Sequence, residues 1–472
     1  MIPLSLAEIA AVTGGEVAGI APEAAETLVV DGPVVTDSRE ARAGSLYIAR
    51  IGAENDGHRF IANAQAGGAV AALVTQDTGP LPRAVVADEQ AAFVALARHL
   101  AQAVPGLLIA GITGSSGKTS TKDLLGQVLA TAGETIAPVG SFNSEVGVPL
   151  TVARVTPTTR FLVVEMGARG IGHIAYLTQI APPRIGIVLN VGSAHVGEFG
   201  SREAIALAKS ELVAALPDDG LAILNADDPA VRAMADATRA RVQLVGTAPD
   251  ADLRADDITL DPAGRAGFRV TTPAGAADVT LAVAGRHQVG NALAVIAAAL
   301  EAGMPLPAIV TSLATAGPVS RYRMEVSERA DGVTIVNDAY NANPESMAAA
   351  LAALETMGAG RRRIAVLGPM LELGVESDAA HAEVGALVAA HGVDALVVVD
   401  PVAAPIGIGA QAAGSAAEVR YAADAEAAYA DAVALVRPGD IVLVKSSNGA
   451  GLRFLGDRLR DTQPSDKEEQ TR

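Results

Sequence analysis

The chain has 472 residues, which is too long for one hydrophobic core and predicts about three domains. A net charge of −18, 3% aromatic residues and no tryptophan disfavour a nucleic-acid partner, which needs a basic surface and stacking side chains. The absence of cysteine excludes disulfides and cysteine-bound zinc, and no apolar run is long enough to span a membrane, so we expect a cytoplasmic protein without a membrane partner.

Residues 1–105 are predicted to form a small α/β domain. A helix is expected from Ser5, and the residues ahead of it lack the basic region of a signal peptide. The domain is expected to end at Pro105-Gly106, because this pair stops a helix. The predicted elements are strands at 28–30, 45–50 and 69–74 and a helix at 91–104.

The segment Gly111-Ile-Thr-Gly-Ser-Ser-Gly-Lys-Thr-Ser120 joins a predicted strand, 108–113, to a predicted helix, 118–132. Such an arrangement is typical of a phosphate-binding loop, because glycines let backbone N–H groups turn inward and the helix N-terminus favours anions. Lys118 can reach the terminal phosphates, and the Thr119 hydroxyl can hold Mg²⁺. The segment therefore predicts a nucleoside triphosphate site. The alternative is a glycine turn followed by an incidental Lys-Thr pair.

Strands and helices continue to alternate as far as Gly317-Pro318, our second domain boundary, and predict a parallel sheet covered on both faces. Residues 247–283 alternate with period two between turns, which predicts a small antiparallel appendage. The other predicted elements are strands at 161–165, 185–190 and 221–225 and a helix at 291–302.

Three side chains in this stretch are candidates for chemistry, because open α/β sheets bind ligands at the carboxyl ends of their strands. Glu165 follows an apolar strand and could hold Mg²⁺ opposite Thr119, although a surface glutamate at a strand end would show the same pattern. His195 follows the strand that ends near Asn190, where a structural or solvated histidine is the alternative. Lys209 lies in a predicted helix, and its simplest interpretation is an ordinary helix-face lysine.

Residues 318–461 are predicted to form a second α/β unit, and the polar residues 462–472 a disordered tail. The segment Asp338-Ala-Tyr-Asn-Ala-Asn-Pro follows a strand and either contributes a binding site or only caps the next helix. Arg323 and Lys445 are expected to be mobile cations that approach the nucleotide if this unit closes on the central one. The predicted strands lie at 333–337, 364–367, 395–400 and 441–445.

A series of motifs runs along the chain from Thr36 to Asn448. They are Thr36-Asp-Ser-Arg, Asp56-Gly-His-Arg-Phe, Thr113-Gly-Ser-Ser-Gly-Lys-Thr, Phe142-Asn-Ser-Glu-Val-Gly-Val-Pro-Leu, Glu165-Met-Gly-Ala, Asn190-Val-Gly-Ser-Ala-His, Ala208-Lys-Ser-Glu, Gly285-Arg-His-Gln-Val-Gly-Asn-Ala-Leu, Asp338-Ala-Tyr-Asn-Ala-Asn-Pro, and Gly368-Pro-Met-Leu-Glu-Leu-Gly with His381. No single motif is decisive, but their order and number resemble the Mur ligase family.

The resemblance implies an α/β protein of three domains: a UDP-substrate-binding domain at 1–105, a central ATP-binding domain with a parallel sheet at 106–317, and a Rossmann-like domain at 318–461. It also implies amide-bond formation that depends on ATP and Mg²⁺. Two of the segments, Asp-Ala-Tyr-Asn-Ala-Asn-Pro and Met-Leu-Glu-Leu-Gly, are most similar to the members that join D-alanyl-D-alanine to UDP-N-acetylmuramoyl-tripeptide, through an acyl phosphate, in peptidoglycan synthesis. We expect a monomer.

The resemblance also implies a role for individual residues. Catalytic roles would belong to Lys118, Glu165, His195 and Lys209. The nucleotide would be held by Thr113, Gly114, Ser115, Ser116, Gly117, Lys118, Thr119, Asn291, Arg323 and Asp338. The substrates would contact Ser38, Arg39, Asn143, Ser144, Tyr340, Asn341 and Asn343. Metal ions would be bound by Thr119, Glu165, His195 and a carbamylated Lys209. Arg323 is preferred to Arg321 because it begins the family's Arg-Met-Glu pattern.

Two other functions stay open at this point. A Mur-like ligase could use another acceptor, such as a single amino acid or a folylpolyglutamate, although the chain lacks the Asp-Asn-Pro-Arg segment of the diaminopimelate- or lysine-adding members. A nucleotide-dependent interaction protein that has lost ligation is the alternative from another class. The intact residues Lys118, Glu165, His195 and Lys209 argue against it.

Overall fold

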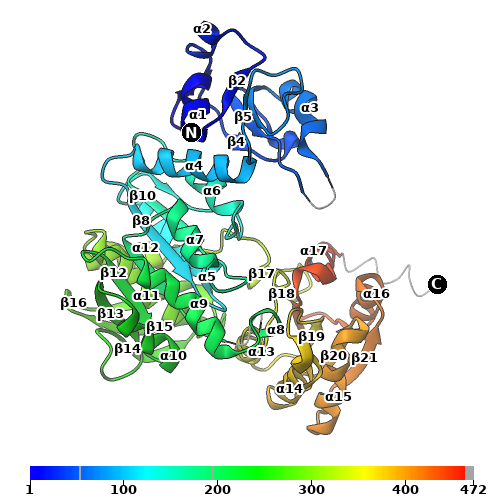
Figure 1. Ribbon diagram of the computed structural model, residues 1–472. Helices are drawn as coiled ribbons and strands as arrows, with labels where there is room; N and C mark the ends of the chain where they lie inside the picture. Colours follow the sequence, from blue (N-terminus) through cyan, green and yellow to red (C-terminus); the bar gives the residue numbers. More distant parts are fainter. Residues whose placement is uncertain (53–54, 193–195, 463–472) are drawn as a thin grey trace.

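The computed structural model describes residues 1–52, 55–192 and 196–462. Figure 1 shows three groups of helices and strands that follow one another along the chain, each built around its own main sheet. This arrangement confirms the predicted α/β class. Within the described residues, no helix is both long enough and apolar enough to cross a membrane.

The N-terminal group is built on a five-stranded sheet in the order β2-β7-β6-β5-β4, in which only β2 is antiparallel to its neighbour. Alternate residues of β5 face opposite ways, so that Leu46 packs with α1 and α4 while Tyr47 packs with α3. The elements are β1 (Leu4–Ser5), α1 (Leu6–Thr13), β2 (Glu16–Ala18), α2 (Pro22–Ala25), β3 (Val29–Val30), β4 (Val34–Val35), β5 (Ser45–Ile48), α3 (Ile61–Ala66), β6 (Ala69–Val74), β7 (Arg83–Val85) and α4 (Glu89–Gln102).

The central group is built on a nine-stranded sheet in the order β16-β15-β14-β13-β12-β11-β8-β10-β9. Its strands bury both faces, since Ile109 of β8 packs with α6, α7 and α9 while Ala110 packs with α5, α11 and α12. The elements are β8 (Leu108–Thr113), α5 (Lys118–Ala130), β9 (Thr135–Ile136), α6 (Gly147–Val152), β10 (Phe161–Glu165), α7 (His173–Ile180), β11 (Ile185–Val188), α8 (Val196–Phe199), α9 (Arg202–Ala214), β12 (Leu221–Asn225), α10 (Pro229–Arg232), β13 (Arg241–Gly246), β14 (Leu253–Leu260), β15 (Arg265–Thr272), β16 (Gly275–Ala284), α11 (Gln288–Glu301) and α12 (Leu306–Leu313).

The antiparallel strands predicted at 247–283 are present, but they do not form a separate appendage. β14 pairs in parallel with β13, and β15 and β16 then extend the same sheet antiparallel to one another. Phe268 and Val270 of β15 bury their side chains against the core that α11 also covers. The appendage is therefore the edge of the central sheet.

The C-terminal group is built on a six-stranded sheet in the order β17-β18-β22-β19-β20-β21, parallel except for β17. Helices α13, α14 and α15 cover one face, and α16 and α17 cover the other. The elements are β17 (Glu325–Glu328), β18 (Thr334–Asn337), α13 (Pro344–Met357), β19 (Arg363–Leu367), α14 (Ser377–Ala390), β20 (Ala395–Val399), α15 (Ala404–Ala412), β21 (Glu418–Ala422), α16 (Ala425–Leu435), β22 (Ile441–Lys445) and α17 (Leu452–Asp461).

The prediction of a disordered tail from residue 462 is wrong at its first residue. Thr462 is buried, and its hydroxyl lies 2.8 Å from the Tyr429 hydroxyl on α16. Residues 463–472 lie outside the described residues.

Helix α4 joins the first two groups. It contacts α1 in the N-terminal group and both α6 and α7 in the central group, as Figure 1 also shows. One continuous cluster of buried side chains runs from Leu6, through Phe93 and Leu100 on α4, to Val148 and Leu177. The N-terminal and central groups therefore share a hydrophobic core.

Candidate active site

A cavity of about 1000 Å³ lies between the carboxyl ends of the central strands and the C-terminal group. Side chains and loops from both groups line it, as expected for an open α/β sheet. The lining includes the phosphate loop after β8, Glu165 at the end of β10, Lys209 on α9, and the segment between β18 and α13.

The phosphate loop is held in shape by the segment that follows β11. Ser116 N–H donates to the Asn190 side-chain oxygen at 2.9 Å, and the Asn190 amide donates back to the Ser116 carbonyl at 3.2 Å. Gly192 N–H donates to the Ser115 hydroxyl at 2.9 Å. The left-handed φ of 81° at Gly117 turns the chain into α5, so that the free N–H groups of the first helical turn face the cavity.

Thr119 and Glu165 form a buried cluster of oxygen atoms beside this loop. The Thr119 hydroxyl donates to Glu165 Oε2 at 3.0 Å, and the Asn143 amide donates to Glu165 Oε1 at 2.8 Å. Hydroxyl and carboxylate oxygens are the ligands that Mg²⁺ prefers. The donor set therefore fits a magnesium ion, although the described residues include no group of three or more His, Asp or Glu side chains arranged to hold a metal.

Lys118 and Lys209 bring two ammonium groups to the same part of the cavity. Lys118 Nζ donates to the Gly114 carbonyl at 2.5 Å, which folds the side chain over the loop. Burial lowers the pKa of Lys209 well below its usual range, and the neighbouring charge of Lys118 lowers it further. A buried lysine held toward its neutral form is a nucleophilic amine, so Lys209 is not an ordinary helix-face lysine.

The C-terminal group supplies one acidic and two basic side chains, Asp338, Arg323 and Lys445, to the opposite wall of the cavity. Asp338 Oδ2 accepts from Lys445 at 2.5 Å, while Asp338 Oδ1 accepts from the Met324 N–H at 3.0 Å. Arg323 lies 4.4 Å from the centre of the Tyr340 ring and donates to the Ser141 hydroxyl at 3.0 Å. Its Nε atom is buried and has no hydrogen-bond partner among the described residues.

The expectation that Lys445 is a mobile cation is wrong. Its side chain is 1% exposed and is fixed between Asp338 and the Asn341 carbonyl. Burial lowers the pKa of Lys445, and the Asp338 carboxylate opposes that shift. Lys445 acts in this structure as the partner that holds Asp338 in place.

Two hydrogen bonds, one from the Asn343 side chain and one between backbones, bring the C-terminal group against the central group beside the cavity. The Asn343 amide lies 3.5 Å from the Ser115 carbonyl of the phosphate loop, and Gly197 N–H donates to the Glu372 carbonyl at 3.2 Å. Asn343 also caps α13, because its side-chain oxygen accepts from Ser346 N–H. The Asp338–Pro344 segment therefore does more than cap α13, because it also lines the cavity.

Comparison with known proteins shows which family this chain belongs to. Residues 112–299 match the model of the Mur ligase middle domain, and residues 322–448 match that of the Mur ligase glutamate ligase domain. The chain belongs to the Mur ligase family. It is an ATP-dependent ligase.

Individual relatives extend this Mur ligase match over nearly the whole chain. The UDP-N-acetylmuramoyl-tripeptide–D-alanyl-D-alanine ligase of Mycobacterium tuberculosis is 46% identical over 97% of this chain and 98% of its own, and that of Escherichia coli is 36% identical over 84% and 85%. The crystal structure of MurF from Acinetobacter baumannii superposes with a TM-score of 0.87 at 29% identity, covering 98% of this chain and 99% of its own. MurF from Thermotoga maritima, solved in complex with ADP, gives 0.78 at 28% identity, covering 92% and 97%.

Most of the predicted site residues of this Mur ligase meet at the cavity. Asn291 lies on α11 beneath the phosphate loop, where its amide donates to Gln288 Oε1 at 2.8 Å. Ser144 also lines the cavity, next to Asn143. Thr113, in contrast, is fully buried at the end of β8 and does not line the cavity.

Two predicted substrate residues lie away from the cavity. Ser38 and Arg39 follow β4 in the N-terminal group and do not line the cavity. The exposed Arg39 guanidinium pairs with Asp37 and lowers the pKa of that carboxyl to about 2. The prediction for His195 lies outside the described residues.

Sequence reasoning missed several residues of the Mur ligase cavity. Ser141 links Arg323 to Thr119, since its hydroxyl contacts both side chains. His287 also lines the cavity, and burial lowers its pKa. Ser141 stands two residues before Asn143 and His287 two before Val289, each within or beside a motif, so position next to a motif was the one available signal.

Proposed function

We propose that this Mur ligase joins D-alanyl-D-alanine to UDP-N-acetylmuramoyl-tripeptide in peptidoglycan synthesis, with ATP as the energy source. The observation that carries the proposal is the cavity, in which the phosphate loop and Glu165 face Arg323 and Asp338 from the C-terminal group. The relatives of 46% and 36% identity that bear this activity in their names support the choice of substrates. The reaction is proposed to take place in the cytoplasm, by a monomer.

The chemistry must bring two anions together, because a substrate carboxylate attacks the γ-phosphate of ATP. Lys118 and Arg323 are placed to neutralise phosphate oxygens, and the backbone N–H groups of the loop bind them directly. Thr119 and Glu165 would hold Mg²⁺, which supplies further charge neutralisation when bound. Asn143 is proposed to orient Glu165 through their hydrogen bond.

The carboxylate oxygen would form a bond to the γ-phosphorus as the bond to ADP breaks, which gives an acyl phosphate. The amine of D-alanyl-D-alanine then attacks the acyl carbon, loses a proton, and displaces phosphate to leave the amide. Water would hydrolyse the acyl phosphate, so the site must exclude it. The contacts of Asn343 and Glu372 with the central group close the two sides of the cavity toward each other and support this role.

Lys209 is proposed to carry a carbamate, as the family resemblance implies. Carbamylation needs a neutral amine, and the buried environment of Lys209 lowers its pKa in the required direction. The product would be an anionic oxygen ligand next to the Thr119–Glu165 cluster, completed by His195.

A single assay tests the proposed function. Phosphate release is measured with ATP, Mg²⁺ and UDP-N-acetylmuramoyl-tripeptide, with and without D-alanyl-D-alanine. Turnover that depends on the dipeptide is expected. Turnover with a single amino acid or a folate in its place would favour the other acceptor class, and ATP binding without any turnover would favour an interaction protein.

A further inference from the structure

Helix α5 presents one side chain per turn to two different parts of the molecule. Thr119 reaches Glu165 in the cavity, while Asp123 and Gln127, four and eight residues further on, reach the segment between α12 and β17. Side chains four residues apart lie on one face of a helix. The face of α5 that begins at the phosphate loop is therefore hydrogen-bonded to residues 314–324, which we call the connection to the C-terminal group.

Three buried residues make most of these contacts: Lys122, Asp123 and Ser320, which are 1%, 6% and 7% exposed. Ser320 N–H donates to Asp123 Oδ2 at 2.8 Å, and the Ser320 hydroxyl donates to Asp123 Oδ1 at 3.1 Å. Lys122 forms an ion pair with Asp123 and donates to the Ser320 hydroxyl at 3.0 Å and to the Pro138 carbonyl at 3.1 Å. The buried charges are thus paired and hydrogen-bonded, the condition under which burial of charge is tolerated.

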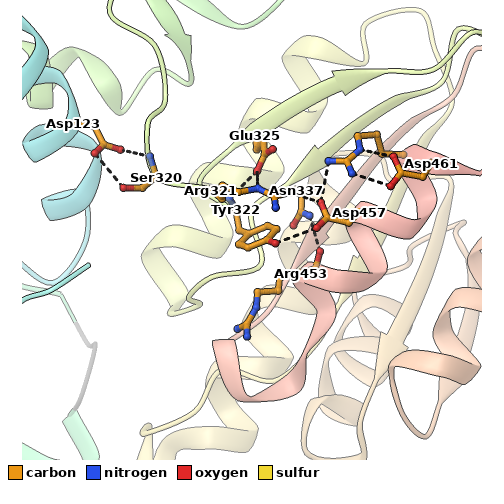
Figure 2. A network of polar contacts seen from close by, with 10 residues as sticks. Asp123, Ser320, Arg321, Tyr322, Glu325, Asn337, Arg453, Asp457 and Asp461 are labelled. Carbon is orange, nitrogen blue, oxygen red and sulfur yellow. Dashed lines mark hydrogen bonds and ion pairs between the residues drawn. The ribbon is translucent and has the colours of Figure 1, made fainter. Parts of the chain in front are cut away.

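Ser320 is hydrogen-bonded to the central group, whereas the two residues that follow it are hydrogen-bonded to the C-terminal group. Figure 2 shows Ser320 held by Asp123, whereas Arg321 and Tyr322 turn to Asp457 on α17. Arg321 donates to Asp457 at 2.8 Å and the Tyr322 hydroxyl donates to it at 3.0 Å. The central group therefore holds the chain at Ser320, and the C-terminal group holds it at Arg321 and Tyr322.

Arg323 stands two residues beyond Arg321 and returns to the central group. Its guanidinium donates to the Ser141 hydroxyl, which lies 2.8 Å from the Thr119 hydroxyl. These contacts form a closed chain of residues. It runs from Thr119 along α5 to Asp123 and from there to Ser320. It continues along the backbone to Arg323 and returns through Ser141 to Thr119. A displacement of Ser320 would move the backbone from which Arg323 reaches the cavity.

We propose that Asp123 is a positioning residue for the nucleotide site: by holding Ser320, it sets where Arg323 enters the cavity. Asp123 does not line the main cavity and acts only through the connection. The inference rests on the proposed nucleotide site, but it does not depend on which acceptor the enzyme uses.

The test compares two double variants that differ only in the hydrogen-bond acceptor. Lys122→Met with Asp123→Asn removes both buried charges but keeps an oxygen that accepts from Ser320 N–H. Lys122→Met with Asp123→Leu removes the acceptor as well, in a side chain with the same number of heavy atoms and the same branching. Affinity for ATP is measured directly, by titration of each protein with the fluorescent analogue N-methylanthraniloyl-ATP in the presence of Mg²⁺.

The Asn variant is expected to bind the analogue within about twofold of the native chain, and the Leu variant about tenfold more weakly. In an Arg323→Ala background, the change from Asn to Leu is expected to have no further effect, because Arg323 is the group that Asp123 positions. Equal affinities of the Asn and Leu variants, or a tenfold loss that persists without Arg323, would overturn the proposal.

Asp440→Ala provides the matched control for the loss of a buried acid. Asp440 is 4% exposed and pairs with Arg362 at 3.0 Å, outside the cavity, so this variant should unfold at a lower temperature yet bind the analogue normally. Weakened binding by Asp440→Ala would show that general loosening explains the effect and would overturn the proposal. A native chain that binds ATP but does not ligate D-alanyl-D-alanine would contradict only the proposed function.

Discussion

Lys118 and Glu165 carry opposite charges and both line the cavity beside the phosphate loop. Neither belongs to the clusters of buried apolar side chains, so each can be substituted without leaving a hole in the hydrophobic core. Lys118→Ala removes the cation that is proposed to neutralise the phosphates, and Glu165→Gln keeps the hydrogen bond from Asn143 but removes the negative charge. We expect each variant to lose about a hundredfold or more in kcat, because neutralisation of developing charge is usually the largest single catalytic contribution. Phosphate release measures the loss, and a near-native kcat in a folded variant would contradict the role assigned to that residue.

The environment of Lys209 predicts a dependence on carbon dioxide. Only the neutral amine takes up CO₂, and a lowered pKa means that more of it is neutral at a given pH; as the pH falls, Lys209 becomes protonated and the carbamate is lost. Initial rates in CO₂-depleted buffer should therefore be low and should recover with added bicarbonate. At a fixed CO₂ concentration the recovery should be weaker at lower pH. Rates independent of bicarbonate at every pH would contradict carbamylation.

Alanine substitutions at Gly117 and Gly106 separate two free-energy costs, that of a left-handed backbone and that of a steric clash with a neighbouring side chain. A Cβ atom at Gly117, where φ is 81°, would lie 2.7 Å from the buried Asn291 side-chain oxygen. Gly106 has a φ of 74° with nothing within 4 Å of a Cβ atom, so Gly106→Ala carries the backbone strain alone. Each alanine should cost about 1 kcal/mol or more in unfolding free energy, but only Gly117→Ala should also lose ATP affinity. Normal ATP affinity in Gly117→Ala would contradict the close packing of Asn291 against the loop.

The phosphate loop could be predicted from the sequence because its chemistry is local: glycines, Lys118 and Thr119 are neighbours in the chain. The partners of that loop could not, since Ser141, Asn190 and Arg323 reach it only through the fold. Lys445 was misjudged for the same reason, because its burial against Asp338 depends on the pairing of β22 with β18.

At the scale of elements, the loop between β19 and α14 depends on a buried neutral histidine. His381 Nε2 accepts from Met370 N–H at 2.9 Å, and Nδ1 lies 2.7 Å from the Ser377 carbonyl, so the ring is neutral with its proton on Nδ1. Burial lowers its pKa from the usual 6.5, while the Ser377 carbonyl and Asp378 oppose the shift.

A group whose pKa is lowered on folding stabilises the folded state above its unfolded pKa, and this contribution is lost as the pH falls through the folded value. The stability of the native chain should therefore decline below pH 6.5, and His381→Gln should flatten that decline. Denaturant unfolding of both proteins at several pH values checks the prediction. Parallel pH profiles for the two proteins would contradict it.

The predicted strands at 108–113, 161–165, 221–225 and 441–445 match the observed ones, because fully buried parallel strands are continuous apolar runs. Three partly exposed strands were missed: β17 and β21, at the two edges of the C-terminal sheet, and β13, inside the central sheet. They carry charged residues such as Arg241, Glu325 and Glu418, so their apolar pattern is weak. Which strands lie side by side also escaped prediction, and for that reason β14–β16 were taken for a separate appendage.

At the scale of the whole molecule, the shared core predicts that the N-terminal and central groups unfold together. Phe93 is fully buried on α4, which contacts both groups. Phe93→Ala should cost about 3–5 kcal/mol and should lower the unfolding temperature of both groups equally. Hydrogen exchange resolved by peptide measures this: protection should fall together in residues 1–105 and 106–317 and less in residues 318–461. A loss confined to residues 1–105 would show that the two groups unfold independently.

The core that α4 shares with α6 and α7 limits how the enzyme could be recombined with its relatives. A chimera that exchanges only residues 1–105 would set foreign side chains against Val148 and Leu177, and the mismatch would lie inside a close-packed interior. A chimera that exchanges the C-terminal group from Ser320 onward would instead alter a few hydrogen bonds and one buried ion pair at that point of the chain. A transplanted C-terminal group would have to keep Lys122, Asp123 and Ser320 as a set, together with the contacts of Arg323 with Ser141 and of Asn343 with Ser115, whereas the N-terminal group has to bring α6 and α7 with it.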